Sequence, residues 1–352
     1  MHGGTTSSKL AKKTQLKSLK LLSLCLSLPA LLCLIGCTEQ SSTFQFRYTH
    51  EQPAASLRSQ SMLFFEKELE RRSNGRIEVE LYFSGVLGSE RESMDFLSMG
   101  IIQGHRGGFF ADANPKYKLF TLPFLVDNWD QATQLIRSPF TARINQEAAV
   151  RGFHIPATGI SQGFRAHTNS KHPINHPNDI KGLKMRVPSQ EVYVQTALAF
   201  GANPQEIPAV EIYQSLQTGV VDGQDNPPAN IWDYKIHEVS EFLTITHYST
   251  GPDPLMVNLK WYNSLPDDLK KIFDEVATDA MRLSDKLNRD KEADYIDKLK
   301  NKLSVNVVEG EQLKPFRAAV KPVYDYFIAQ GDFSAADIEE ARKAAQGREV
   351  VF

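Results

Sequence analysis

The chain has 352 residues, of which 41% are hydrophobic, 10% aromatic and 23% charged, a composition that excludes collagen-like and low-complexity proteins. The formal net charge is −2, but residues 1–36 hold five lysines and no acidic residue. The remainder has 35 basic and 42 acidic residues, a net charge of −7. A mildly acidic body without a basic run lacks the positive surface that a phosphate backbone requires, so no nucleic acid partner is expected.

The N-terminal residues 1–36 predict a signal peptide. Their lysines precede an apolar run of 16 residues, 21–36, which is short for a transmembrane helix and suits a signal-peptide core. The run ends in Leu34-Ile-Gly-Cys37, which resembles the lipobox of bacterial lipoproteins. We therefore expect a lipidated Cys37, a tether over 37–43, and a periplasmic protein held to the membrane only by its lipid. The alternative is an ordinary signal peptide that contains cysteines.

Cysteine usage limits the chemistry of the mature body. All three cysteines, Cys25, Cys33 and Cys37, lie at or before the expected lipidation site. The body after Cys37 therefore has no disulfide, no cysteine nucleophile and no cysteine metal site.

Residues 44–160 predict alternating strands and helices. Strands are predicted by period-two alternation, and helices by apolar spacing, by the capping box of Ser89 with Glu92, and by a closing Gly100. The predicted elements are a strand over 44–48, a helix over 56–72, a strand over 76–83, a helix over 89–99, a short strand over 101–106, a helix over 129–150 and a strand over 155–160. This order predicts the α/β class with parallel sheets, where ligands bind beyond the carboxyl ends of the strands.

A second unit of the same kind runs from about 155 to 250. Alternation over 182–188 predicts a strand, and Ser189 is expected to N-cap the next helix. Arg186 then lies at the carboxyl end of a strand and beside a helix N-terminus, and both features favour an anion. Further along, the pattern predicts a helix over 211–217, a brief strand over 220–221 and a tight polar turn over 222–228 whose side chains face the crevice.

One long helix is expected over about 266–303, where no glycine or proline follows Pro266. At 1.5 Å per residue it would be about 55 Å long, more than one small domain needs. We expect it to span two domains, which the chain length also suits. A coiled coil is the alternative, although the apolar spacing drifts from a strict heptad.

Ordered motifs along the body resemble the substrate-binding subunits of tripartite ATP-independent periplasmic (TRAP) transporters of the DctP type. The most specific are Gly182-Leu-Lys-Met-Arg-Val-Pro188, Gly201-Ala-Asn-Pro204 and the segment from Glu211 to Pro227. The resemblance implies a two-lobed periplasmic-binding-protein-like fold that closes over an organic acid and delivers it to a TRAP membrane permease driven by an ion gradient. The expected lobes are 44–162 with 252–290, and 163–251 with 291–352. No cofactor is implied.

The resemblance also assigns site residues. Arg186 occupies the position of the arginine that holds the substrate carboxylate, where a planar guanidinium offers two parallel donors; the alternative is a surface arginine in an ion pair. Arg165 either contacts the ligand or braces the site through an ion pair. Asn226 matches an asparagine that hydrogen-bonds the ligand, or else makes an Asx turn. Ser189 stands where a small polar residue adds a contact.

Departures from the family pattern bear on the ligand. Arg106 follows Gly100 where relatives have small residues, so it either adds a second cation to the pocket or is a solvated charge at a strand end. His50 and Glu51 follow the first strand and either meet ligand hydroxyls or lie in a loop. An extra arginine and polar loops favour a C4-dicarboxylate or a hydroxylated sugar acid over an apolar acid.

Two other function classes are alternatives to this one. An exported enzyme would need a nucleophile with a base, or paired carboxylates. The sequence has no Gly-x-Ser-x-Gly elbow, and His172 and His176 are separated by Pro173, which argues for a loop rather than a metal site on a helix. We therefore expect no catalytic residues and no metal. A bilobed ligand-sensing protein without transport stays open.

Overall fold

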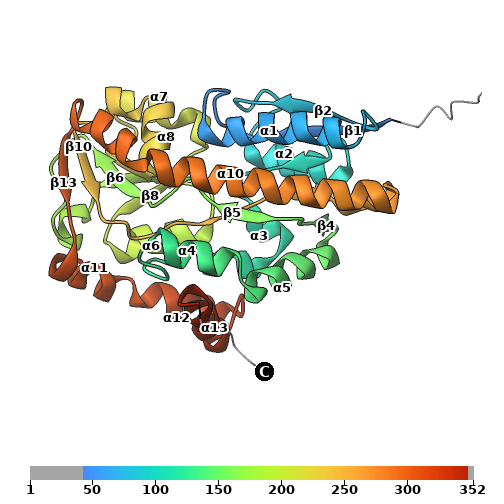
Figure 1. Ribbon diagram of the computed structural model, residues 1–352. Helices are drawn as coiled ribbons and strands as arrows, with labels where there is room; N and C mark the ends of the chain where they lie inside the picture. The colour runs from blue at the N-terminus through green and yellow to red at the C-terminus, as the bar shows by residue number, and fades with distance from the viewer. Residues whose placement is uncertain (1–42, 348–352) are drawn as a thin grey trace, which may run out of the picture. The chain divides into compact units, whose positions relative to one another are not determined.

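The computed structural model describes residues 43–347, which form helices and strands arranged as two mixed β-sheets and one two-stranded sheet (Figure 1). The residues before 43, including the expected signal peptide and Cys37, lie outside the described part. Within residues 43–347, the structure contains no helix with the length and hydropathy that crossing a membrane requires.

The first sheet has the strand order β2-β1-β3-β12-β4. Its strands are β1 (Phe44–Thr49), β2 (Ile77–Tyr82), β3 (Gly104–His105), β4 (Phe153–His154) and β12 (Met256–Asn258). β1 pairs in parallel with β2 and β3, whereas β12 runs antiparallel to β3 and β4. The predicted β-α-β order is confirmed, but the sheet is mixed rather than parallel, because a strand from residue 256 onward returns to complete it.

Helix caps place α1 (Leu57–Arg72) and α2 (Glu90–Met99) directly after strands of this sheet. Ser56 accepts the backbone N–H of Ser59 at the start of α1. Ser89 and Glu92 form the predicted capping box at the start of α2, and Gly100 ends that helix in the left-handed conformation. The caps therefore fix where each helix starts, and the first turns of α1 and α2 lie beyond the ends of β1 and β2.

The second sheet has the order β13-β10-β6-β9-β7-β8. Its strands are β6 (Ala166–Asn169), β7 (Lys184–Val187), β8 (Asn203–Glu206), β9 (Gly223–Asn226), β10 (Phe242–Ile245) and β13 (Ser304–Val307). β7 is parallel to β8 and β9, while β6 is antiparallel to β9 and β10.

The predicted turn over 222–228 and strand over 220–221 are wrong. Residues 223–226 form β9, a fully buried strand between β6 and β7. A polar run predicts a turn because buried polar groups are costly without partners, but here the partners exist. Gln224 Nε2 donates to Thr168 Oγ1 at 2.8 Å, and Asp225 pairs with Arg165. A Cβ at Gly223 would collide with the carbonyl oxygen of Thr168, so glycine permits this close pairing.

Other boundaries differ from the predictions. The single helix expected over 129–150 is divided into α4 (Trp129–Ile136) and α5 (Pro139–Glu147), because Pro139 starts a new helix that Ser138 caps. The short strand expected over 101–106 covers only β3. The N-cap of α6 (Glu191–Ala199) is Gln190, without a side-chain cap bond, so the expected capping role of Ser189 is wrong.

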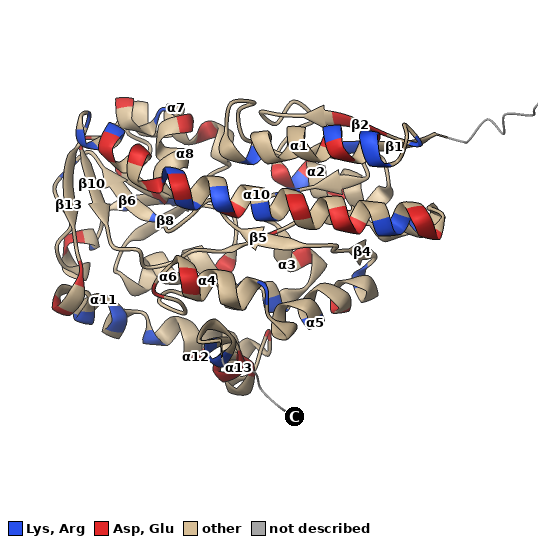
Figure 2. Cartoon of the chain, in the orientation of Figure 1, with Lys and Arg blue, Asp and Glu red and all other residues tan. Residues whose placement is uncertain are grey.

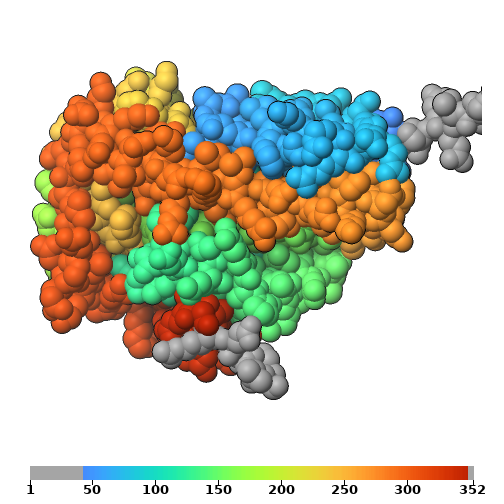
Figure 3. Space-filling view, in the orientation of Figure 1, coloured from blue at the N-terminus to red at the C-terminus, as the bar shows by residue number. Residues whose placement is uncertain are grey.

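The long predicted helix is confirmed as α10 (Asp267–Lys300), with 34 residues. It packs on α1, on β5 (Thr158–Ile160) and on α8 (Pro228–Asp233), and it therefore contacts elements associated with both main sheets. Trp129 Nε1 donates to Glu292 at 2.7 Å, which joins α4 to α10 where the two lie side by side (Figure 3). Acidic and basic residues follow one another along α10 (Figure 2), among them the pair Lys291 and Asp294 at 2.9 Å.

Two strands cross between the main sheets: β5 pairs antiparallel with β11 (Pro252–Pro254). At the C-terminal end, α12 (Lys321–Gln330) packs on α6, while α13 (Ala335–Ala345) packs on α4 and α5. The remaining elements are α3 (Phe110–Ala113), η1 (Pro115–Thr121), η2 (Ala148–Arg151), η3 (Pro177–Ile180), η4 (Ala209–Glu211), α7 (Ile212–Gln217), η5 (Ile236–Glu238), α9 (Leu259–Ser264), η6 (Gly310–Leu313) and α11 (Lys314–Ala319). The exact lobe boundaries stay a prediction.

Candidate functional site

A polar cavity of about 70 Å³ is lined by residues from both main sheets and from the crossing strands. Its lining comprises Gln52, Arg58, Glu90, Gly107, Gly108, Phe110, Ser161, Gln162, Arg165, Arg186, Pro188, Gln190, Tyr193, Ala209, Asn226, Asn230, Tyr234 and Pro252. Three predicted residues, Arg186, Arg165 and Asn226, therefore meet at one cavity beyond the strand ends.

Arg186 is a buried cation without an ionic partner. It lies near the carboxyl end of β7 and is 3% exposed. Its Nε donates to the carbonyl oxygen of Ile207 at 2.7 Å, and within residues 43–347 no carboxylate forms an ion pair with it. Burial, reinforced by neighbouring Arg165, lowers the pKa of Arg186 to about 10, so the group stays charged at neutral pH. A buried unpaired charge is costly, and an anion in the cavity would offset that cost.

Arg165 is braced by Asp225. Its Nε forms an ion pair with the Asp225 carboxylate, its Nη2 donates to the Asp225 carbonyl oxygen at 2.6 Å, and its guanidinium lies 4.5 Å from the ring centre of Tyr193. Burial opposes ionisation of Asp225, but Arg165 outweighs it and holds the pKa of Asp225 below its usual value. Arg165 thus lines the cavity while its charge is already neutralised.

Asn226 belongs to a chain of side-chain amides. Gln224 donates to Thr168, Asn226 Nδ2 donates to Gln224 Oε1, and Asn230 Nδ2 donates to Asn226 Oδ1 at 3.3 Å. The chain ends in the cavity at Asn230, whose Oδ1 is buried without a hydrogen-bond partner. Asn226 lies on the strand β9, so the Asx-turn alternative is wrong.

Arg106 does not line the cavity. It is fully buried, its Nη2 forms an ion pair with Asp253, and its Nη1 donates to Ser61 at 2.8 Å. Both expected placements, a pocket cation and a solvated charge, are therefore wrong. Arg58 is instead the third arginine that lines the cavity, beside Arg186 and Arg165, and its Nε contacts the same Asp253 at 3.2 Å.

The other predicted residues lie beside the cavity without lining it. His50 Nε2 bonds Ser59 Oγ at 2.9 Å, and burial, with Arg58 nearby, lowers its pKa well below the usual value. Glu51 accepts the backbone N–H of Glu90 at 2.8 Å. Ser189 is exposed, and its neighbour Gln190 lines the cavity instead.

Glu51 and Glu90 form a coupled pair of carboxyl groups. Burial and the neighbouring Glu90 raise the pKa of Glu51 to about 8, and burial also raises the pKa of Glu90. Glu90 Oε1 accepts the N–H of Gly108 at 3.1 Å, and Arg58 and Arg186 favour its charged form. Because like charges resist joint ionisation, a charge on one of these carboxyl groups opposes ionisation of the other.

Sequence reasoning missed Arg58 and Glu90, although a signal for both was present. Arg58 is the second residue of α1 and Glu90 is the first residue of α2, and each helix follows a strand of the first sheet. First-turn residues of such helices lie at the carboxyl edge of the sheet, where ligands bind. Applied to both predicted helix starts, that rule would have indicated these side chains.

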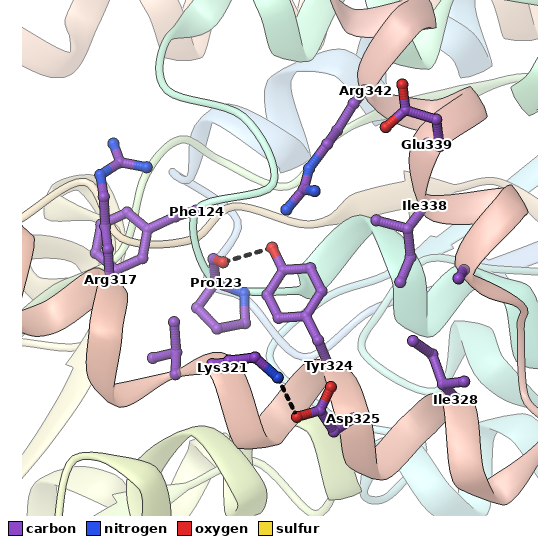
Figure 4. A pocket seen from close by; sticks show the side chains of 12 residues that line it. Pro123, Phe124, Arg317, Lys321, Tyr324, Asp325, Ile328, Ile338, Glu339 and Arg342 are labelled. Atoms are coloured by element: carbon purple, nitrogen blue, oxygen red, sulfur yellow. Dashed lines mark hydrogen bonds and ion pairs between the residues drawn. The ribbon is translucent and has the colours of Figure 1, made fainter.

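A second, larger pocket of about 390 Å³ lies among α11, α12, α13 and Phe124 (Figure 4). Tyr324 donates to the carbonyl oxygen of Pro123 at 2.8 Å, and Lys321 pairs with Asp325 at 2.6 Å. Arg317 pairs with Asp127 at 2.6 Å. Arg342 also lines the pocket and forms no ion pair with the described residues, but it is exposed to solvent, so the pocket lacks a buried uncompensated cation like Arg186.

Comparisons with known proteins agree with this geometry. Residues 48–330 match DctP, described as bacterial extracellular solute-binding protein, family 7. The C4-dicarboxylate-binding periplasmic protein DctP of Rhodobacter capsulatus is 25% identical over 313 residues, which cover 86% of this chain and 90% of that protein.

Two solved structures extend the match to the fold. The sugar acid binding protein of Advenella mimigardefordensis in complex with galactonate has a TM-score of 0.82 and 26% identity, covering 87% of this chain and 99% of that one. A TRAP periplasmic solute-binding protein of Polaromonas bound to D-erythronate has a TM-score of 0.80 and 27% identity, covering 85% and 98%. The predicted two-lobed α/β fold and the family resemblance are confirmed. The chain belongs to the DctP family, family 7 of the bacterial extracellular solute-binding proteins.

Proposed function

We propose that the protein captures an organic acid outside the cytoplasm and delivers it to a TRAP membrane permease, with the acid's carboxylate held by Arg186. The observation that carries this proposal is a charged arginine, 3% exposed, at a polar cavity and without a carboxylate partner among the described residues. An anionic ligand would both accept the hydrogen bonds of its guanidinium and compensate its charge.

The surroundings favour a carboxylate at this position. Arg165 also lines the cavity, and Asp225 fixes its guanidinium in place. The lining comes from both main sheets, so a bound acid would be enclosed by both. Enclosure removes water and strengthens the ion pair, which is how a binding protein retains a small polar ligand.

Two ligand classes agree with this site: a C4-dicarboxylate and a hydroxylated sugar acid. The name of the Rhodobacter relative supports the first, and the ligands of the Advenella and Polaromonas proteins support the second. All of them contain a carboxylate. The common chemistry is therefore the Arg186 ion pair, and the remainder of the cavity decides between the classes.

We further propose that this is binding without catalysis, and that the protein acts in the periplasm, anchored through a lipid on Cys37. The family and its solved members are binding proteins, which supports the first point. Mass spectrometry of the mature N-terminus tests the second: a diacylglyceryl group on Cys37 is expected, and an unmodified Cys37 or cleavage elsewhere contradicts it. A ligand-sensing role without transport would leave uptake unchanged when the gene is deleted.

Calorimetry of the purified protein tests the role of Arg186. The titrants are aldonates, uronates and C4-dicarboxylates, and the variants are Arg186→Ala and Arg186→Lys. Removing the buried partner of a carboxylate costs about 2–5 kcal/mol of binding free energy, and Lys restores only part because it lacks the bidentate geometry. Arg91→Lys, at an exposed arginine of α2, is the matched control. A loss below about 1 kcal/mol in Arg186→Ala would refute the assignment.

A further inference from the structure

The cavity wall offers hydrogen-bond acceptors that no protein donor fills. Gln190 Oε1 and Asn230 Oδ1 are buried without a partner, and the Asn230 side chain is 7% exposed. The Glu90 carboxylate joins them in the lining, and it forms no ion pair with any residue of 43–347. Buried acceptors without donors are costly. A ligand that brings O–H groups to this wall would satisfy the Gln190 and Asn230 oxygens, and it would add a donor to the Glu90 carboxylate, whose Oε1 already accepts the N–H of Gly108.

The side chains of Gln190 and Glu90 lie close together. A Cβ placed on Gly108 would come within 2.6 Å of Gln190 Nε2 and 2.9 Å of Glu90 Oε2. The side chains of Gln190 and Glu90 therefore approach the same point from the two main sheets, above a glycine backbone that leaves room for them. Both groups line the same cavity as Arg186.

The charges of the cavity lining also favour a ligand with a single carboxylate. Arg58 and Arg106 share the single carboxylate of Asp253, and Arg165 is neutralised by Asp225. Arg186 and the Arg58–Asp253–Arg106 group thus contribute one positive charge each. Burial raises the pKa of Glu90, whereas Arg58 and Arg186 favour its charged form, and Glu90 removes one positive charge when it is ionised. The remaining single positive charge is neutralised by one ligand carboxylate, whereas a second carboxylate would lie in the same small cavity as Glu90.

We propose that this protein selects polyhydroxylated monocarboxylates, with Glu90, Gln190 and Asn230 receiving the ligand hydroxyls, and that Glu90 rejects acids with a second carboxylate. This inference rests on the proposed function, because it takes Arg186 as the carboxylate anchor. Glu90 is then a specificity residue whose negative charge distinguishes a terminal hydroxymethyl group from a terminal carboxylate.

Matched ligand pairs test the proposal on the wild-type protein. Erythronate with meso-tartrate, xylonate with xylarate, gluconate with glucarate and galactonate with galactarate share their hydroxyl stereochemistry and differ only at the terminal carbon. Calorimetry at pH 7.5 should show at least one aldonate binding at least about tenfold more tightly than its dicarboxylate partner. Tighter binding of the dicarboxylates, or of succinate, overturns the inference, and so does the absence of binding by every aldonate.

The variant Glu90→Gln keeps the size of the side chain and removes its charge. We expect weaker aldonate binding, stronger binding of the matching dicarboxylate, and a preference ratio that falls by at least about tenfold. Asp95→Asn, which removes an exposed carboxylate from the same helix, should leave the ratio unchanged. An unchanged ratio in Glu90→Gln overturns the role of Glu90. If Arg186→Ala still loses binding, the proposed function stands; if neither variant changes any affinity, the proposed function fails as well.

Discussion

Arg106 and Arg186 are both buried arginines near strand ends, but their surroundings differ. Arg106, beside β3, forms an ion pair with Asp253 and donates to two serine hydroxyls. Arg186, in β7, has a backbone carbonyl as its protein acceptor and faces a cavity. Burial, opposed by Arg106 and Arg58, leaves the pKa of Asp253 below its usual value, whereas the pKa of Glu51 near Arg186 is raised to about 8. A compensated arginine maintains the fold, and an uncompensated one indicates a binding site.

The largest expected effect is on the free energy of unfolding when Arg106, the arginine with a paired charge, is replaced. Arg106→Met should lower the free energy of unfolding by about 3–5 kcal/mol, because removing one partner of a buried pair leaves charge behind. Urea denaturation followed by circular dichroism measures it. The residual pairing of Asp253 with Arg58 places the expected value near the lower limit. A loss below about 1 kcal/mol would mean that the Arg106 pair is not structural.

The next effect is stabilisation by ligand. An acid present at about 100 times its Kd should add about 2.7 kcal/mol to the wild type, because it binds only the folded form. Thermal denaturation with and without the tightest-binding acid measures this as a shift in Tm. The shift should persist in the Arg91→Lys control and vanish in Arg186→Met. A shift in Tm that survives in Arg186→Met would contradict the assignment of Arg186 as the arginine that binds the acid.

A further effect depends on pH. Since the folded-state pKa of Glu51 lies near 8, above its unfolded value of about 4.5, the folded protein binds an extra proton between these values. Stability should therefore decline as pH rises from about 4.5 to 8, by up to about 1.4 kcal/mol per pH unit. Glu51→Gln should flatten this decline, which urea denaturation at pH 5, 6, 7 and 8 would detect. Parallel profiles for wild type and variant would exclude Glu51 as the source, and exposed Glu78→Gln is the control.

The smallest effect concerns Arg186 without ligand. Arg186→Met should leave the free energy of unfolding within about 1 kcal/mol of the wild type or raise it slightly, because it removes a buried cation that has no carboxylate partner. Urea denaturation followed by circular dichroism measures this free energy as it does for Arg106→Met. A loss comparable to that of Arg106→Met would show that Arg186 supports the fold.

Local signals were enough to predict much of the architecture. The caps at Ser56 and Ser89 and the uninterrupted apolar spacing of α10 depend on neighbouring residues only, and those elements were predicted. β9 was missed because its polar residues are stable in a sheet only through partners such as Thr168, 56 positions away from Gln224. Pro139 was a visible break that the helix prediction overlooked.

The candidate site was harder to predict for the same reason. Arg186 and Arg165 were identified from motifs, but whether Arg106 or Arg58 faces the cavity depends on Asp253, which lies 195 residues from Arg58 in sequence. No local pattern contains that information. Whether a buried arginine has a carboxylate partner depends on the tertiary structure. The presence or absence of that partner distinguishes a structural arginine from a binding one.

Helix α10 has a consequence for how the molecule unfolds. It packs on α1 and β5 and also on α8, so one 34-residue helix supplies packing surface to elements of both main sheets. Loss of either sheet would expose apolar side chains of the helix on which the other depends. We therefore expect the two lobes to melt in a single cooperative transition, with calorimetric and van't Hoff enthalpies that agree.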